Sequence, residues 1–216
     1  MNRRDFSLHL AGAGLGLALA PAARAQGGPV EGQHYVKLST PVPSQLPAGK
    51  KVEVIEFFSY ACPHCKEFDP LLDGWIKRLP ADVYFHRVAV AFNARWLTLQ
   101  KAFFALENMG KLDDALHKKI FHTVHVQNQF IGTDAEAIAF VKANGIDDAK
   151  FAEMLKSFQV DNQVKRARTL GENYKIDGVP ALGIQGRFYT SASLAGDYPK
   201  LLAVTDFLIQ RSRNGA

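Results

Sequence analysis

The chain's only two cysteines stand in the segment Cys62-Pro63-His64-Cys65. Thiols at this spacing can form a disulfide bond, exchange it with another protein, or supply half of a zinc site. A bridge that closes so short a loop restrains the unfolded chain very little, so stability is a poor reason for such a bond. The pair therefore favours thiol–disulfide redox chemistry.

A reactive cysteine acts as its thiolate, and the elements around the pair predict how that charge is stabilised. Residues 52–58 form an almost unbroken run of β-branched and aromatic residues, typical of a strand buried on both faces. We predict a helix from there through about Leu79, with Pro63 in the first turn, where a missing N–H is tolerated. Free N–H groups and the positive end of the helix dipole then face Cys62, while Cys65 is more buried on the same helical face. We expect Cys62 to attack and Cys65 to resolve.

Two further side chains are candidates for tuning the pair. His64 lies between the sulfurs and adds positive potential beside the Cys62 thiolate, which would make the disulfide more oxidising. Glu56 is a carboxylate in a largely apolar strand, and burial would raise its pKa far enough to exchange protons with Cys65 near neutrality. The plainer alternatives are a solvated surface histidine and a paired structural carboxylate.

A zinc site would need ligands beyond the two cysteines. Three histidines lie together on a separate predicted helical segment, and we expect them to be surface or groove residues: His117, His122 and His125. We therefore predict no metal and no bound cofactor.

The predicted elements follow the order βαβ, a helical block, then ββα. Thr133 and Glu136 form a capping box for one helix of the block, and a glycine suits the late hairpin turn. Pro180 precedes a strand, where a cis peptide bond is plausible and an ordinary turn proline is the alternative. Strands are predicted at 35–38, 52–58, 83–92, 181–185 and 187–189, and the later helices at 94–109, 112–126, 135–143, 149–158, 161–174 and 198–211.

The first 25 residues predict an export signal. Arg3 and Arg4 precede a short apolar run from Leu8 to Ala20, and Ala23-Arg24-Ala25 fits a cleavage site. The two arginines also fit the twin-arginine pattern, and an N-terminal membrane anchor is the alternative. An exported chain can keep a disulfide. The formal charge of +5 falls to +3 without this segment, too mild and scattered to indicate nucleic-acid binding.

The segment EFFSYACPHC from Glu56 to Cys65, the later Gly178-Val179-Pro180-Ala181 and the order of elements resemble the DsbA family of the thioredoxin superfamily. The resemblance covers about residues 33–211. It implies an α/β, thioredoxin-like fold (βαβ…ββα) with an inserted all-helical domain. The implied units are an export signal at 1–25, a thioredoxin-like core at 33–93 and 175–213, and the helical insertion at 94–174.

The resemblance also implies the activity of a periplasmic protein disulfide oxidase. Cys62 would carry a mixed disulfide with a reduced exported protein, and Cys65 would remain buried. Pro180 would be cis and opposite the dithiol, and the backbone of Val179 would pair with an extended substrate peptide beside a groove. A DsbB-like inner-membrane quinone reductase would reoxidise the enzyme, which we expect to be a monomer.

One departure from the family concerns Glu56: the family's lysine near this glutamate has no clear counterpart in the segment Phe85-His86-Arg87. Two other functions also stay open. A disulfide isomerase or reductase would use the same cysteines, with a reductase working at a more reducing potential. A peptide-binding or chaperone-like module would use the groove without redox turnover and would tolerate alanine at Cys62.

Overall fold

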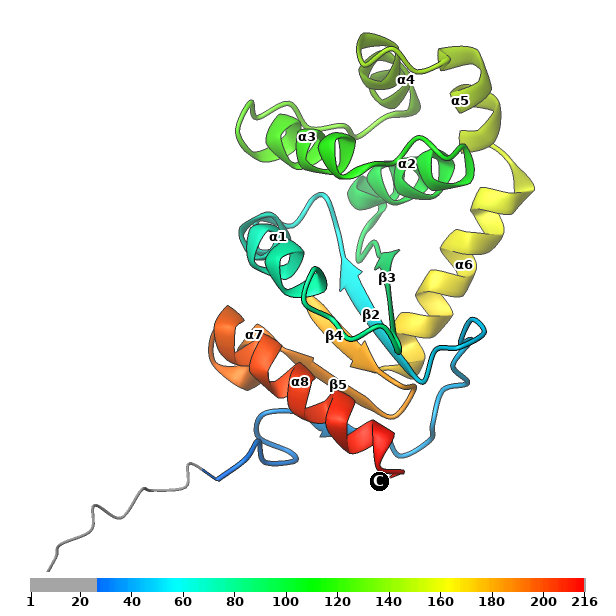
Figure 1. Cartoon of the computed structure of the whole chain (residues 1–216). Helices are drawn as coiled ribbons and strands as arrows, with labels where there is room; N and C mark the ends of the chain where they lie inside the picture. The colour runs from blue at the N-terminus through cyan, green and yellow to red at the C-terminus, as the bar shows by residue number, and fades with distance from the viewer. Residues whose placement is uncertain (1–26, 216) are drawn as a thin grey trace, which may run out of the picture.

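The computed structural model describes residues 27–215, and the predicted export signal lies outside these residues. A five-stranded mixed sheet forms the centre, in the order β1-β5-β4-β2-β3 (Figure 1). Strands β2 and β3 are parallel, and the other neighbouring pairs are antiparallel. The strands are β1 (Val36–Lys37), β2 (Val52–Phe58), β3 (Val83–Ala89), β4 (Ala181–Ile184) and β5 (Phe188–Ser191).

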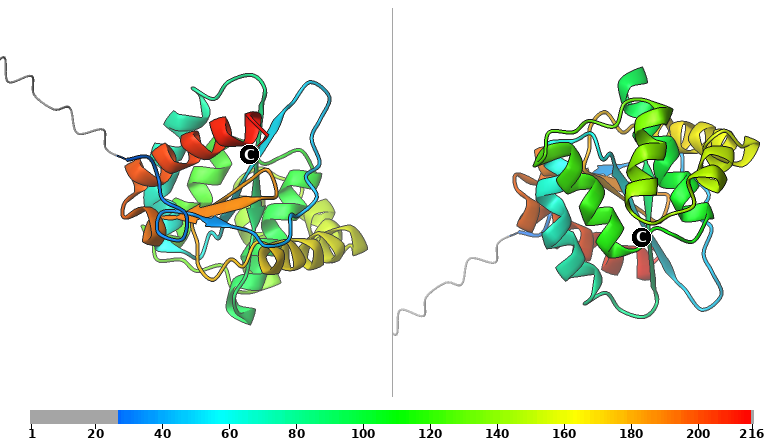
Figure 2. Two further views of the ribbon diagram at one scale, coloured as in Figure 1. Left: turned by 90° about the horizontal axis from the view of Figure 1, so that it is seen from below. Right: turned by 90° about the horizontal axis from the view of Figure 1, so that it is seen from above.

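Strand β2 is buried at all seven positions, as its composition predicts. Helices α1 (Pro63–Ile76) and α8 (Tyr198–Arg213) cover one face of the sheet, and α6 (Phe158–Asn173) lies on the other (Figure 2). Val54 belongs to the apolar cluster beneath α1 and α8, whereas Phe57 points the other way and packs its ring 5.2 Å from that of Tyr174. The strand that leads to the dithiol is therefore fixed from both sides.

Five helices and a short 3₁₀ turn separate β3 from β4, where the sequence predicts five helical segments. The capping box of Thr133 and Glu136 is confirmed. Asn93 caps the 3₁₀ turn, so the first predicted helix begins with that turn, and Ser157 caps α6 three residues earlier than predicted. Besides α6, the elements are η1 (Ala94–Trp96), α2 (Leu97–Asn108), α3 (Asp114–His125), α4 (Asp134–Ala143) and α5 (Asp148–Leu155).

Other boundaries differ from the sequence prediction by a few residues. Helix α1 ends before Leu79, because the N–H groups of Arg78 and Leu79 bond three residues back and tighten the chain ahead of Pro80. Strand β3 stops at Ala89 rather than at Phe92, and a short helix, α7 (Ala192–Ala195), was not predicted.

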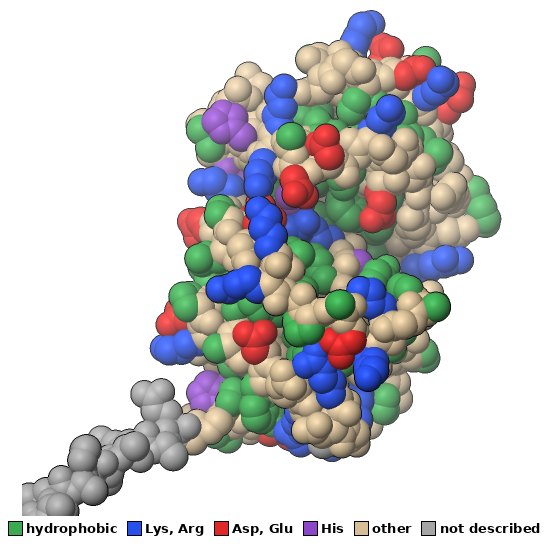
Figure 3. All heavy atoms as spheres, viewed as in Figure 1, with side chains coloured by type: hydrophobic (Ala, Val, Ile, Leu, Met, Phe, Trp, Pro, Cys, Tyr) green, Lys and Arg blue, Asp and Glu red, His purple; other side chains and the backbone are tan. Residues whose placement is uncertain are grey.

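No helix among residues 27–215 is long and apolar enough to cross a membrane. Basic and acidic side chains are intermixed on the face drawn in Figure 3 rather than gathered by sign.

The β4–β5 turn depends on Gly186. Its φ is +63°, and a Cβ there would lie 1.8 Å from the carbonyl oxygen of Val42, whose own N–H donates to Gly186 O at 2.7 Å. Gly49 has a similar φ of +81° but open space around it.

Replacing these two glycines with alanine separates conformational strain from steric overlap. Gly49→Ala is expected to lower the free energy of unfolding by about 1 kcal/mol, the cost of a left-handed backbone alone. Gly186→Ala adds a backbone clash and is expected to cost about 3 kcal/mol or more. Urea unfolding measures both, and equal losses would contradict the close approach of Val42.

Candidate redox site

Cys62 is the N-cap residue of α1, with an extended backbone (φ −93°, ψ 118°) and Pro63 immediately after it. The Cys62 N–H donates to Ser59 O at 3.0 Å, which turns the chain sharply between the end of β2 and the helix. The predicted helix-start position of Cys62 is confirmed. The first N–H groups of a helix have no partner within it, so those of His64 and Cys65 can stabilise negative charge on this sulfur.

The two thiols, both free in the structure, have opposite environments. A hydrogen bond from the Cys65 thiol, the backbone N–H groups of Cys65 and His64, and the charge of His64 together lower the pKa of Cys62 to about 6, although burial opposes this. Burial raises the pKa of Cys65 well above its usual value, and the neighbouring Cys62 and Glu56 raise it further. Cys62 therefore ionises near neutral pH, while Cys65 stays protonated.

His64 is exposed. Its Nδ1 is 3.4 Å from Glu67 Oε2, and its carbonyl accepts a hydrogen bond from the Tyr198 hydroxyl at 3.2 Å. The same hydroxyl lies 3.3 Å from Glu67 Oε2 and shares its single proton between the two acceptors, so this tyrosine links the first turn of α1 to the start of α8.

Glu56 is buried beneath the dithiol and forms an ion pair with Arg87, whose Nε lies 2.8 Å from Glu56 Oε2. Burial raises the pKa of Glu56 to about 7, even though the guanidinium lowers it. The expectation that residues 85–87 hold no counterpart to the family's lysine was wrong, because Arg87 supplies a cation. The parallel register sets Glu56 directly opposite Arg87, a pairing that can be found only once the register is known.

Arg87 also reaches two carboxylates of α1, at 3.3 Å from Asp69 and 3.5 Å from Asp73. His117 Nε2 lies 3.1 Å from Asp69 Oδ1, and the histidine is almost fully buried. Of the expected surface or groove position, the surface alternative was therefore wrong for His117, which instead lines a small hollow beside Arg87. Burial of this histidine depends on how α3 packs against α1, which the local sequence does not encode. His122 is exposed as expected, and His125 is half-buried.

The bond between Val179 and Pro180 is cis, as the family resemblance implies. Val179 O lies 3.3 Å from Cys62 Sγ, so the loop before β4 directly faces the dithiol. Residues 117 positions apart in the chain thus form one site.

Comparison of the sequence with known proteins identifies the family to which the chain belongs. Residues 71–197 match the DSBA-like thioredoxin domain. The thiol:disulfide interchange protein DsbA of Bordetella pertussis is 39% identical over 216 residues, covering 99% of this chain and 100% of that protein. The protein of the same name from Pseudomonas aeruginosa PAO1 is 35% identical over 185 residues, 86% of each. The chain belongs to the DsbA family.

Solved DsbA structures agree with this membership. The crystal structure of Pseudomonas aeruginosa DsbA matches with a TM-score of 0.81 at 34% identity, over 86% of this chain and 95% of that chain. The oxidoreductase DsbA from Xylella fastidiosa matches with a TM-score of 0.78 at 29% identity, over 86% and 98%. The predicted thioredoxin-like α/β fold with added helices is confirmed, and this DsbA-family chain is a thiol:disulfide oxidoreductase of disulfide-bond formation.

In the present protein, a hollow of about 480 Å³ lies beside the dithiol. It extends from His64 across the cis-proline loop to the region around α7 and the start of α8. Its other lining residues are Asp177, Gly178, Val179, Pro180, Ser191, Ala192, Ser193, Gly196, Asp197 and Tyr198.

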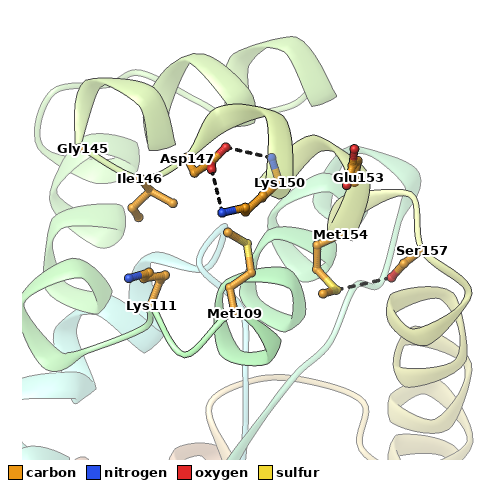
Figure 4. A pocket seen from close by; sticks show the side chains of 9 residues that line it. All are labelled: Met109, Lys111, Gly145, Ile146, Asp147, Lys150, Glu153, Met154 and Ser157. Carbon is orange, nitrogen blue, oxygen red and sulfur yellow. Dashed lines mark hydrogen bonds and ion pairs between the residues drawn. The ribbon is translucent and has the colours of Figure 1, made fainter.

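A larger hollow, of about 850 Å³, lies away from the DsbA dithiol, between the end of α2 and α5. Figure 4 shows Met109 and Met154 at this hollow, with Lys150 paired to Asp147. None of its lining residues belongs to β2, α1 or the loop before β4. Within residues 27–215, no group of three or more His, Cys, Asp or Glu side chains is arranged to hold a metal ion.

Thiolate absorbance of the reduced protein tests the environment of Cys62. We expect a midpoint near pH 6, because the pKa of Cys62 is lowered to about 6. Since the Cys65 thiol provides the largest stabilising hydrogen bond, Cys65→Ala should raise the midpoint by about 1 pH unit, and Cys65→Ser, which keeps a donor, by less. Cys62→Ser should remove the transition. A wild-type midpoint near the usual thiol value of about 8.5 would contradict this.

Glu56→Gln tests the buried carboxyl through stability. Because folding raises the pKa of Glu56 from 4.5 to about 7, its contribution to stability is present at low pH and is lost as pH rises toward 7. In the oxidised protein, the variant should therefore gain about 3 kcal/mol relative to wild type between pH 4.5 and 8. Glu172→Gln, at an exposed glutamate paired with Arg168, is the matched control. A difference from wild type that does not change with pH would contradict the raised pKa.

Proposed function

We propose that this protein is a disulfide donor, which passes its Cys62–Cys65 disulfide to reduced exported proteins. The observation that carries the proposal is the opposite environment of the two thiols, with Cys62 acidified at the helix start and Cys65 buried. A substrate thiolate attacks Cys62 Sγ, the Cys62–Cys65 bond breaks, and a mixed disulfide forms at Cys62. A second substrate thiolate then attacks the substrate sulfur of that bond, and Cys62 leaves as a thiolate.

The balance of this exchange gives the direction of transfer. The substrate loses two electrons and gains a disulfide, while the enzyme pair gains them and becomes a dithiol. Cys62 is a good leaving group because its thiolate is stabilised by N–H groups and by His64. Pro63 supports this geometry, since it occupies the first helical position without needing a hydrogen-bond partner.

Cys65 needs a proton when the internal disulfide opens, because its buried thiolate is strongly disfavoured. Glu56 is the candidate donor. Its pKa of about 7 leaves it part-protonated near neutrality, and its charge influences Cys65, which requires proximity. Arg87 keeps the carboxylate paired after it has released the proton.

The cis-proline loop is the candidate binding surface for substrate. The backbone of Val179 faces Cys62 Sγ, and an extended peptide that pairs with this backbone would bring its cysteine to the nucleophile. The hollow of about 480 Å³ next to this loop offers room for the residues that flank the substrate cysteine.

The setting of the reaction follows from the predicted export signal at residues 1–25 and from the DsbA family. We place the enzyme in the periplasm as a monomer, with reduced exported proteins as substrates. A DsbB-like membrane quinone reductase would restore the disulfide, and no bound cofactor or nucleic acid takes part. The division into core segments 33–93 and 175–213 and a helical insertion at 94–174 stays a prediction.

Oxidation of a peptide with two cysteines tests the donor role. The oxidised protein should convert the reduced peptide stoichiometrically, because the acidified Cys62 favours the reduced enzyme. Cys65→Ala, incubated with the disulfide form of the peptide, should accumulate a mixed disulfide at Cys62 that mass spectrometry detects. Cys62→Ala should do neither. A Cys62→Ala variant that retains the protein's effect on the peptide would instead favour a binding or chaperone-like role.

A further inference from the structure

Tyr60 lies two residues before Cys62 and is held from two directions by α3. Its hydroxyl is 2.7 Å from His117 Nδ1, and its backbone carbonyl accepts a hydrogen bond from His125 Nε2 at 2.8 Å. Between these two histidines, the ring of Phe121 packs 5.0 Å from that of Tyr60. One face of α3 therefore forms hydrogen bonds with both the side chain and the backbone of Tyr60.

The hydrogen bonds of His117 have a defined direction. Asp69 Oδ1 lies 3.1 Å from His117 Nε2, and a carboxylate only accepts, so Nε2 carries the proton. Nδ1 then accepts from the Tyr60 hydroxyl. Burial lowers the pKa of His117, which agrees with a neutral ring in this arrangement. The chain Tyr60–His117–Asp69 is thus complete, and Arg87 continues it to Glu56.

The segment that Tyr60 anchors sets the position of the nucleophile. Ser59 accepts the Cys62 N–H at its carbonyl, and its hydroxyl accepts the Ala61 N–H at 3.2 Å, so the turn from β2 into α1 is tight. Tyr60 lies in the middle of this turn and is only 1% exposed. A shift of Tyr60 would move Cys62 relative to the N–H groups of the first turn of α1.

We propose that His117 and His125 are positioning residues through which α3 fixes the Tyr60 turn and so sets the reactivity of Cys62. The proposal rests on the role of Cys62 as nucleophile. It assigns to α3 an indirect part in redox chemistry, since both histidines act through their hydrogen bonds to Tyr60. His122 is the internal control, because it is on the same helix and exposed.

Three substitutions on α3 test the hydrogen bond from His125 to the backbone carbonyl of Tyr60. His125→Ala should raise the midpoint of the Cys62 thiolate absorbance by about 0.5 pH unit and shift the equilibrium with glutathione about 3-fold toward a less oxidising protein. His125→Gln keeps an N–H donor and should restore most of both values. His122→Ala should leave both unchanged. A His125→Ala protein with wild-type midpoint and equilibrium would overturn the proposal, even if it unfolded more easily.

Tyr60→Phe tests the hydrogen bond between the Tyr60 hydroxyl and His117. It leaves no large cavity in the core, since only the hydroxyl is lost. We expect the midpoint to rise here too, and an unchanged midpoint would overturn the part assigned to His117. Both readouts use the isolated protein and glutathione. Their failure is therefore distinguishable from failure of the donor role, which would appear as wild-type protein unable to oxidise the peptide.

Discussion

Negative charge on Cys62 Sγ is stabilised at the first turn of α1 by the Cys65 thiol and by the backbone N–H groups of Cys65 and His64. These donors face the sulfur because β2 ends at Phe58 and a tight turn makes Cys62 the N-cap residue. A disulfide carries no charge and gains little from the same donors. Each of them therefore favours the reduced pair, and a pair that is stable when reduced gives up its disulfide readily.

Beneath the helix the environment has the opposite effect. Cys65 and Glu56 share a buried region in which an unpaired charge is expensive, so the thiol stays protonated and the pKa of the carboxyl rises to about 7. Arg87 lowers the cost of the Glu56 carboxylate, and it stays paired with Asp69 and Asp73 when Glu56 takes up a proton. The site thus combines a stabilised thiolate at the start of α1 with a proton-exchanging group below it.

Features carried by neighbouring residues could be predicted from the sequence: the strand before the dithiol, the helix start at Cys62, the carboxylate in the strand and the turn at Gly186. Features that depend on contacts between distant segments could not. Arg87 meets Glu56 only through the register of two parallel strands, and His117 is buried only because α3 packs against the dithiol region. A helical pattern shows which residues share a face, but it does not show what that face covers.

The pH dependence of the reduction potential is the most direct test of thiolate stabilisation at Cys62. Reduction of the disulfide takes up two protons where both cysteines form thiols, which gives a slope of about −59 mV per pH unit. Above the pKa of Cys62 it takes up only one proton, and the slope becomes about −30 mV per pH unit. We predict that this change of slope occurs near pH 6. We also predict that at pH 7 the protein is more oxidising than thioredoxin, whose potential is about −270 mV. A slope of about −59 mV that continued to pH 8, with a potential close to that of thioredoxin, would contradict the acidified Cys62.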